Sequence, residues 1–311
     1  MTEASATFGC FGSTCSVHVG GEEAPRAVAS ARRRLLAWHA RFTRFTTDSE
    51  LSRLNADPRR EVPASPIMRR FAGAVVDAAR LTGGLVDATL LDELESAGYA
   101  RDLGPATNPL RYALALAPRR RPAQARPAAP WRWLGVDERA GVIRRPPGLL
   151  LDSGGLAKGL FADVLAERFR GRPSFAVECA GDLRVGGVPR PVHVTNPFDG
   201  SVIRTFELAS VGVATSGIGK RSWVDPLGRP AHHLLDPSSG TPAFTGVVQA
   251  TAIAPTALEA EMRAKAAVLA GPDDAGAWLP HGGVVVFDDG GLQTQEPADV
   301  RADRPLDSVC G

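Results

Sequence analysis

Segments typical of strands and segments typical of helices follow one another along the chain without a regular alternation. Residues 13–19 alternate and are rich in β-branched side chains, whereas residues 24–42 place apolar side chains at helical spacing. A doubly wound sheet needs strands and helices in strict succession, so the sequence predicts an α+β fold. Further helices are expected within residues 48–55, 65–84, 153–169 and 258–271, and further strands within residues 131–152, 174–187, 192–217, 247–254 and 282–291.

The bulk composition argues against several classes of protein. The chain has 311 residues, of which 44% are apolar and 23% charged, close to the averages of globular proteins. Its net charge of +2 gives no electrostatic reason to expect a nucleic-acid partner. No apolar run approaches about 18 residues, so no membrane span is expected. The first residues lack the basic start and apolar core of a secretory signal, which favours a cytoplasmic protein.

The sequence also predicts the state of the cysteines and the conformation of one irregular segment. Cys10, Cys15, Cys179 and Cys310 form no CxxC pair, so reduced thiols are expected rather than a zinc site or a disulfide framework. Residues 117–130 are rich in proline and arginine and have no apolar period. This stretch is predicted to be a solvated loop.

The predicted helix at residues 258–271 carries a charge at every second position from Glu259 to Lys265. Glu261 and Lys265 stand four residues apart, which makes them neighbours on one helix surface. Such a pair is common on a solvated face, yet it could also belong to a site. The spacing alone leaves both interpretations open.

Glycine-bearing turns with polar side chains follow several predicted strands. Asp152 ends an apolar strand and Lys158 begins the next helix, an arrangement that favours an anion, although the GxxxxGK[ST] spacing of a P-loop is absent. Comparable strand ends carry Asp87, Asp182, Thr215 and Ser216. Each turn alone is ordinary, but together they indicate one large polar pocket for an extended ligand.

Two histidines and an aspartate precede a Pro-Ser-Ser-Gly turn. His232 and His233 could bind a metal, or they could hydrogen-bond a ligand while Asp236 orients one imidazole. Alternatively, Asp236 caps the backbone donors of its own turn. The spacing does not decide between these roles.

Taken in order, several stretches resemble the ApbE family of FAD:protein FMN transferases. They are "FTRFTTDSELSRLN", "TGGLVDATL", "LDSGGLAKGLFADVLAERF", "ECAGDLRVGG", "VATSG", "HHLLDPSSGTP" and "APTALEAEMRAKAAVLAG". The resemblance implies a single T-fold-like domain over residues 1–311, with mainly antiparallel sheets and flanking helices. It also implies a bound FAD, whose FMN half is moved onto a threonine of a target flavoprotein through a phosphoester bond while AMP is released. The implied acceptor sequence is of the Ser/Thr-Gly-Ala-Thr type.

The same resemblance assigns roles to individual residues. Phe11 and Phe45 match positions that contact the flavin or adenine rings. His233 and Asp236 lie in the motif at the pyrophosphate end, with Glu261 as a further catalytic position. Other FAD-binding positions are matched by Leu85, Val86, Asp87, Asp152, Lys158, Asp182, Thr215 and Ser216.

The implied magnesium site differs from the family pattern. The family uses an Asp and a Thr four residues apart on one helix, together with a backbone carbonyl, and these positions are Glu261, Lys265 and Gly155 here. Gly155 keeps its carbonyl, but Lys265 removes an oxygen ligand and places an ammonium beside the cation, where Mg²⁺ needs short oxygen contacts.

Several alternatives therefore remain open. Lys265 swings away from a working metal, or its ammonium replaces the metal as a further catalytic group. Otherwise the protein binds flavin without transferring it, as a pseudoenzyme or a flavin carrier, or it acts as an FAD pyrophosphatase that releases FMN and AMP.

Overall fold

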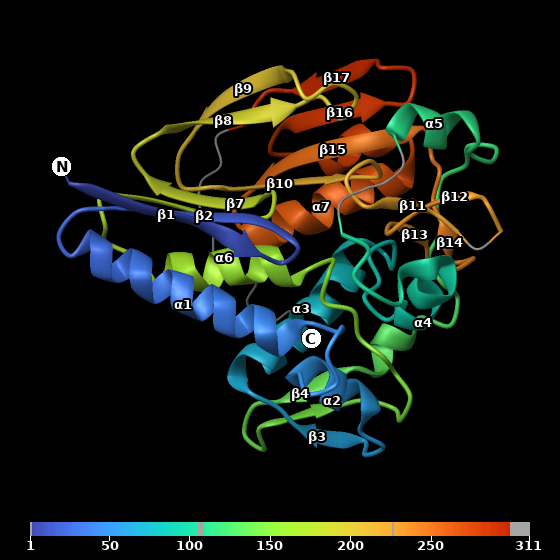
Figure 1. Cartoon of the computed structure of the whole chain (residues 1–311), viewed down its shortest axis with the longest axis horizontal. Coiled ribbons are helices and arrows are strands. Elements are labelled where there is room, and N and C mark those ends of the chain that lie inside the picture. The colour runs from blue at the N-terminus through green and yellow to red at the C-terminus, as the bar shows by residue number, and fades with distance from the viewer. Residues whose placement is uncertain (1, 105–108, 226, 299–311) are drawn as a thin grey trace, which may run out of the picture.

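An eight-stranded, fully antiparallel sheet forms the centre of the molecule, in the order β1-β2-β6-β7-β10-β15-β16-β17 (Figure 1). The computed structural model of the protein describes residues 2–104, 109–225 and 227–298. The strands of this sheet are β1 (Glu3–Cys10), β2 (Ser13–Gly20), β6 (Ser174–Cys179), β7 (Asp182–Gly187), β10 (Gly212–Gly217), β15 (Val247–Ala254), β16 (Gly283–Phe287) and β17 (Leu292–Gln295).

Three long helices cover one face of the sheet. They are α1 (Ala24–Phe42), α6 (Ala157–Arg168) and α7 (Ala257–Ala270), which pack on β1–β2, β6–β7 and β10–β15 respectively. The hairpin of β8 (Arg190–Thr195) and β9 (Val202–Leu208) lies over the other face, where the Gln249 side chain of β15 donates to the Thr195 carbonyl at 2.8 Å. β15 is buried at every position because both of its faces are covered.

A smaller lobe lies beyond the helix layer, at the bottom of Figure 1. It contains α2 (Glu50–Ala56), α3 (Pro66–Leu81) and the three-stranded sheet of β3 (Glu61–Pro63), β5 (Val142–Arg144) and β4 (Gly135–Asp137). The remaining short elements are α4 (Leu91–Leu94), α5 (Leu110–Ala115), single turns at Glu95–Tyr99, Pro130–Trp133 and Ala275–Trp278, and the pairs β11 (Ser222–Val224) with β12 (Pro230–His232) and β13 (Leu235–Asp236) with β14 (Thr241–Pro242).

Helix ends follow their local sequence signals. The sequence offers Asp48 or Ser49 as the cap of α2, and in the structure Ser49 caps this helix by accepting a hydrogen bond from the Ser52 amide at 3.0 Å. Ser65 caps α3 in the same way, and Gly83 and Gly84 follow its end with positive φ, as the paired glycines predicted.

Two parts of the chain differ from the sequence-based expectation. β1 was not predicted, because Glu3–Cys10 has few β-branched residues and becomes a strand by pairing with β2 along its whole length. Residues 117–130 contain no strand and only the start of a single helical turn, as expected, but the segment is not simply solvated. The Arg121 and Ala123 amides donate to the carbonyls of Phe244 and Leu269 at 3.1 and 2.8 Å, and the Ala123 side chain is buried.

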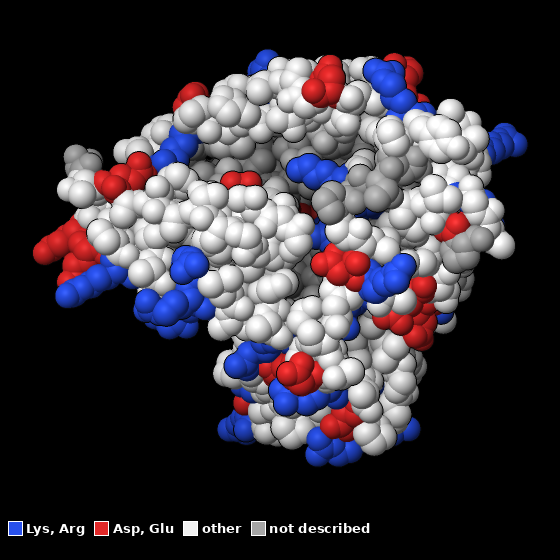
Figure 2. Space-filling view, viewed as in Figure 1, with Lys and Arg blue, Asp and Glu red and all other residues white. Residues whose placement is uncertain are grey.

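Surface charge and cysteine chemistry agree with the composition. Figure 2 shows basic and acidic side chains interspersed over the viewed face. Cys10, Cys15 and Cys179 are buried free thiols, whereas Cys310 lies outside the described residues. None of the helices in residues 2–104, 109–225 and 227–298 combines the length and apolar character required of a bilayer-spanning segment.

Glycines set how closely α7 approaches its neighbours. A Cβ on Gly159 of α6 would lie 2.8 Å from the Ala257 carbonyl oxygen, and one on Gly212 of β10 would lie 2.2 Å from the Ala257 amide nitrogen. Real side chains do not tolerate such distances from backbone atoms. The N-terminus of α7 is therefore held against α6 and β10 where both present glycine.

We predict that Gly159→Ala lowers the free energy of unfolding by about 1–3 kcal/mol, because the added methyl group overpacks the contact between α6 and α7. Gly73→Ala is the matched control within another helix, because a Cβ there meets no atom within 4 Å. Removing that glycine should stabilise the protein by about 0.5–1 kcal/mol. Urea unfolding of both variants measures the difference, and equal effects of the two changes would contradict this account.

Candidate active site

A cavity of about 550 Å³ opens between the helix layer and the segments around α4 and β11–β14. Its volume lies within the range of small-molecule binding sites. Its wall is drawn from widely separated parts of the chain, including the β1–β2 turn, the end of α1, the turn before α6, the end of β10 and the loop between β12 and β13. These are the glycine-bearing strand ends and turns that the sequence singled out, now brought to one place.

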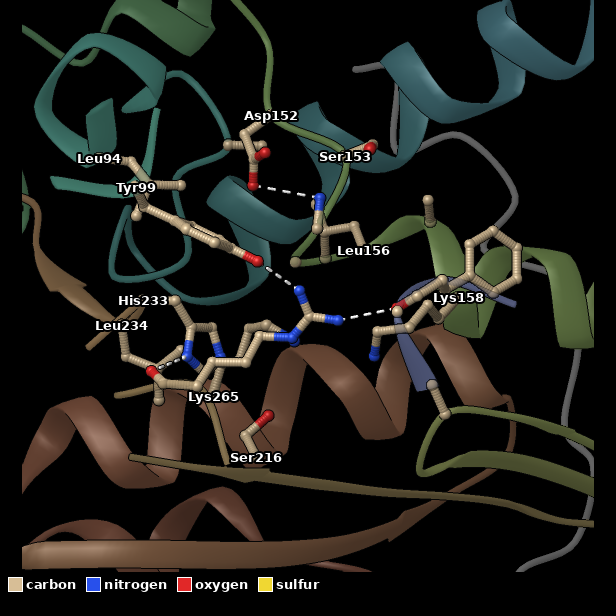
Figure 3. A pocket seen from close by; sticks show the side chains of 18 of the residues that line it. Leu94, Tyr99, Asp152, Ser153, Leu156, Lys158, Ser216, His233, Leu234 and Lys265 are labelled. Carbon is tan, nitrogen blue, oxygen red and sulfur yellow. Dashed lines mark hydrogen bonds between the residues drawn. The ribbon is translucent and has the colours of Figure 1, made fainter. Parts of the chain in front are cut away.

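The structure places most of the predicted site residues in the cavity wall. Those that line it are Phe11, Phe45, Leu85, Val86, Asp87, Asp152, Gly155, Lys158, Thr215, Ser216, His233 and Lys265. Asp182 and Glu261 lie behind the wall and contact Lys158. Asp236 lies outside the lining. Figure 3 shows Lys158, Lys265, Ser216 and His233 across the cavity from Asp152 and Ser153.

Four charged groups form a buried cluster on one side of the cavity. Glu261, with no exposed surface, accepts hydrogen bonds from the Lys265 ammonium at 3.0 Å and the Lys158 ammonium at 3.2 Å through the same oxygen, Oε1. Its other oxygen, Oε2, accepts from the Gly159 amide at 3.0 Å. Lys158 also pairs with the buried carboxylate of Asp182. We name these four side chains (Lys158, Asp182, Glu261 and Lys265) the ionic cluster.

The charges of the ionic cluster depend on one another. Burial opposes the charged form of Glu261, but the ammonium groups of Lys158 and Lys265 lower the pKa of this carboxyl below its usual value. Burial likewise opposes the charge on Lys158, yet Asp182 and Glu261 raise the pKa of its ammonium above the usual value. Burial and the nearby Glu261 carboxylate raise the pKa of Asp182 to about 7. Glu261 is therefore the firmly ionised acid of the cluster.

Local capping orients α7 so that Glu261 and Lys265 face inward. Thr256 accepts a hydrogen bond from the Glu259 amide at 3.1 Å, and the Asp163 carboxylate of α6 accepts from the Ala257 and Leu258 amides at 2.9 Å each. These bonds fix the rotation of the helix at its first turn. The sequence alone did not decide whether Glu261 and Lys265 lie on a solvated helix face or in a site. In the structure both side chains are buried beside the cavity, and Lys265 is only 7% exposed.

The side chains at this position do not fit a magnesium ion. Both oxygens of Glu261 are already engaged by two ammonium groups and an amide, and Lys265 supplies a donor where a metal needs an oxygen ligand. In the part of the chain that the structure describes, no group of three or more His, Cys, Asp or Glu is arranged to hold a metal ion.

The two histidines have different environments. His232 is buried against Phe244, and its Nδ1 accepts a hydrogen bond from the Leu234 amide at 3.3 Å. Its neighbour His233 lines the cavity, with Nδ1 3.4 Å from the Arg221 carbonyl oxygen. Burial, aided by the positive charges of Arg221 and Lys265 among its neighbours, lowers the pKa of His233 well below 6.5. A proton on Nδ1 suits the contact with the carbonyl and leaves Nε2 free to accept a proton.

Two aspartates of the predicted site have contrasting partners. Asp236 Oδ1 accepts from the Gln124 and Ser238 amides at 3.0 Å and from the Ser238 hydroxyl at 2.8 Å, which is the turn-capping arrangement. Asp87 Oδ1 accepts from Thr89, whereas its buried Oδ2 has no hydrogen-bond partner among the described residues. Asp87 therefore keeps a buried carboxylate oxygen that has no hydrogen-bond partner among the described residues, behind a cavity wall to which the residue belongs.

Sequence reasoning missed Arg221. Its guanidinium donates to the Tyr99 hydroxyl at 2.5 Å and to the Phe11 carbonyl at 2.8 Å, while its own carbonyl contacts His233. Arg221 therefore connects three parts of the cavity wall. No local motif marks this arginine, because Tyr99 and Phe11, the partners of its guanidinium, lie more than a hundred residues away in the sequence.

Comparison with known proteins decides the family. A model described as the ApbE family matches residues 11–287. The chain belongs to the ApbE family. This family member is 26% identical over 258 residues to the FAD:protein FMN transferase of Haemophilus influenzae, covering 76% of this chain and 70% of that protein. It is 28% identical over 261 residues to the FAD:protein FMN transferase of Salmonella typhimurium, covering 78% of this chain and 71% of that protein.

Solved structures confirm the predicted ApbE-type α+β fold. The ApbE protein of Thermotoga maritima superposes with a TM-score of 0.77 at 24% identity, covering 95% of this chain and 97% of that chain. The flavinyl transferase ApbE of Pseudomonas stutzeri, in its apo form, has a TM-score of 0.74 at 23% identity and covers 95% of each chain.

We predict that burial of His232 makes stability depend on pH. Burial lowers the pKa of His232 from 6.5 to about 3, so between these values an unfolded chain binds a proton that the folded chain excludes. Stability from this group is therefore complete above pH 6.5 and decreases as the pH falls.

His232→Asn removes this proton uptake while offering an oxygen to the Leu234 amide. Between pH 6.5 and 4.5, the free energy of unfolding should fall more steeply in the parent protein than in the variant, by up to about 1.4 kcal/mol per pH unit. Urea unfolding across this range tests the difference. Parallel pH profiles would show that His232 is not held neutral.

Proposed function

We propose that this ApbE family member transfers FMN from FAD to a threonine hydroxyl of a target flavoprotein. The observation that carries the proposal is a single cavity that combines aromatic side chains, a group of cations and a neutral histidine. FAD has the matching parts, since its ring systems are flat and apolar while its diphosphate is an anion. The activity named for the relatives supports the same reaction.

The aromatic part of the cavity suits a flat ring. Phe45 is 40% exposed and meets Tyr99 edge to face, with ring centroids 5.9 Å apart. The Arg44 guanidinium lies over the Phe45 ring at 4.4 Å and over the Tyr99 ring at 4.7 Å, which fixes both rings. Phe11 stacks on Phe161 at 5.6 Å. We infer that these residues hold the ring systems of FAD, and that Asp87 of the same wall contributes to nucleotide binding.

The cationic part of the cavity suits the diphosphate. Lys158 stands in the first turn of α6, where the helix dipole also favours an anion, and Lys265 and Arg221 lie in the same wall. Charge on the transferring phosphoryl group and on the leaving AMP must be balanced by fixed cations for the reaction to proceed. We assign this role to Lys158, Lys265 and Arg221.

The proposed reaction breaks one bond and forms another. The threonine oxygen bonds to the FMN phosphorus, the bridging P–O bond breaks, and AMP leaves with that electron pair. The hydroxyl proton must go to a base, and the neutral His233 offers Nε2 in the cavity wall. Asp236 contributes by holding the turn that follows His233.

We predict covalent labelling of a suitable target. The protein is incubated with FAD and with a flavoprotein that carries the Ser/Thr-Gly-Ala-Thr type of acceptor. Flavin fluorescence should stay with the target on a denaturing gel, AMP should appear in equal amount, and a Thr→Val target should remain unlabelled. Release of free FMN and AMP would instead show an FAD pyrophosphatase, and bound but unchanged FAD would show a flavin carrier; either result contradicts the proposal.

We predict that His233→Asn slows transfer by about 10²- to 10⁴-fold, because the hydroxyl loses its proton acceptor. Fluorescence titration should show that the variant still binds FAD, since the lysines and aromatic residues are unchanged. Single-turnover labelling separates the rate of transfer from binding. Transfer at the parental rate would remove His233 from the role of base.

A further inference from the structure

The three positions where the family pattern places a metal ion are close together in this structure. A Cβ on Gly155 would lie 3.3 Å from Lys265 Cε, and Lys265 Nζ lies 3.0 Å from Glu261 Oε1. The lysine side chain therefore runs between the Gly155 turn and the Glu261 carboxylate. Its charged end lies against Glu261, the carboxylate that a metal ion at this place would need.

Lys265 is also directed at the ligand cavity. It lines the wall together with Lys158 and His233, and it is held there by Glu261 on its own helix, one turn before it. A lysine ammonium has three donors, so the bond to Glu261 leaves two for an anion in the cavity. Fixed in this way, the ammonium is preorganised for an anionic ligand.

Divalent metal and Lys265 compete for the same acceptor. Glu261 Oε1 accepts from two ammonium groups, and Oε2 accepts from the Gly159 amide. A metal that took Glu261 as a ligand would have to displace at least one of these donors and would stand beside two positive charges. Like charges at contact distance repel, so the site as built disfavours Mg²⁺.

We propose that the Lys265 ammonium replaces the divalent cation, so that this protein binds the diphosphate of FAD without metal. The inference rests on the proposed function for the identity of the ligand. Lys265 supplies one fixed positive charge, and Lys158 supplies the second. A side chain at Gly155 would contact the Lys265 stem, since a Cβ there would lie 3.3 Å from Lys265 Cε.

Metal binding to the protein alone tests the proposal without any flavin chemistry. Mn²⁺ is titrated against the protein, and the signal of free Mn²⁺ is followed by electron paramagnetic resonance. The parent protein should leave the signal unchanged. The double variant Glu261→Asp with Lys265→Thr, which restores the family's oxygen ligands, should bind one Mn²⁺ per chain.

Helix α7 offers a matched control. Glu259 and Arg263 form an equivalent acid–base pair four residues apart, with Glu259 Oε1 2.8 Å from Arg263 Nε, but neither residue lines the cavity. The double variant Glu259→Asp with Arg263→Thr makes the same kind of change and should bind no Mn²⁺. Tight binding of Mn²⁺ by the parent protein would overturn the proposal, as would equal binding by the two double variants.

FAD binding provides a second measurement that does not depend on how well the double variant folds. The parent protein should bind FAD with the same Kd in EDTA and in Mg²⁺. Lys265→Met should weaken binding by about 10- to 100-fold, the size of one charge-assisted hydrogen bond, and Mg²⁺ should not restore it. FAD binding by the parent protein that is lost in EDTA would overturn the inference.

The two proposals fail in different ways. FAD binding that survives EDTA without transfer to any target would reject the transferase function and retain the role of Lys265. Transfer that requires Mg²⁺ would retain the function and reject the replacement of the metal.

Discussion

The buried Glu261 carboxylate is neutralised by partners from other elements, and these contacts connect α6, β7 and α7 at the wall of the cavity. The carboxylate belongs to α7, its partners Lys158 and the Gly159 amide belong to α6, and Lys158 is shared with Asp182 at the start of β7. Removing one partner from a buried charge pair typically costs about 3–5 kcal/mol, because the other charge remains without compensation. Ion pairs as well as apolar packing therefore hold α6, β7 and α7 in fixed positions relative to one another. Glycines at the contacts of α7 allow this helix to lie close to its neighbours.

This constraint also shapes the chemistry of the cavity. Lys158 and Lys265 cannot move far from Glu261, so their positive charges stand ready before a ligand arrives, which is the condition for strong electrostatic stabilisation of a developing charge. Burial of the imidazole, aided by the positive charges of Arg221 and Lys265, lowers the pKa of His233 and keeps it neutral. A base beside fixed cations is a combination that suits transfer of a phosphoryl group to a hydroxyl. In the proposed function, one electrostatic arrangement would therefore serve both ligand binding and proton acceptance.

Much of the fold could be predicted from the sequence where the signal is local. The apolar period of residues 24–42 predicted α1 with the bounds that the structure has, a polar cap at residues 48–49 marked the start of α2, and paired glycines marked the end of α3. The turns that carry Asp87, Asp152 and Thr215 were recognised because glycine and polar residues cluster at strand ends, although only the fold brings them to one cavity. Features made by distant contacts could not be predicted: β1 depends on β2, and Arg221 gains its role from Tyr99 and Phe11. The inward rotation of Glu261 and Lys265 is set by Asp163 on another helix, so their spacing alone could not decide it.

The central claim is that an ammonium group stands where relatives of this fold are expected to use a metal. A crystal structure of the protein with FAD, grown in Mn²⁺ and recorded at the manganese absorption edge, tests it most directly. The account predicts Lys265 Nζ within hydrogen-bond distance of a phosphate oxygen of FAD, still paired with Glu261, and no anomalous peak at this position. An anomalous peak coordinated by Glu261 and the Gly155 carbonyl, with Lys265 turned away from both, would contradict it.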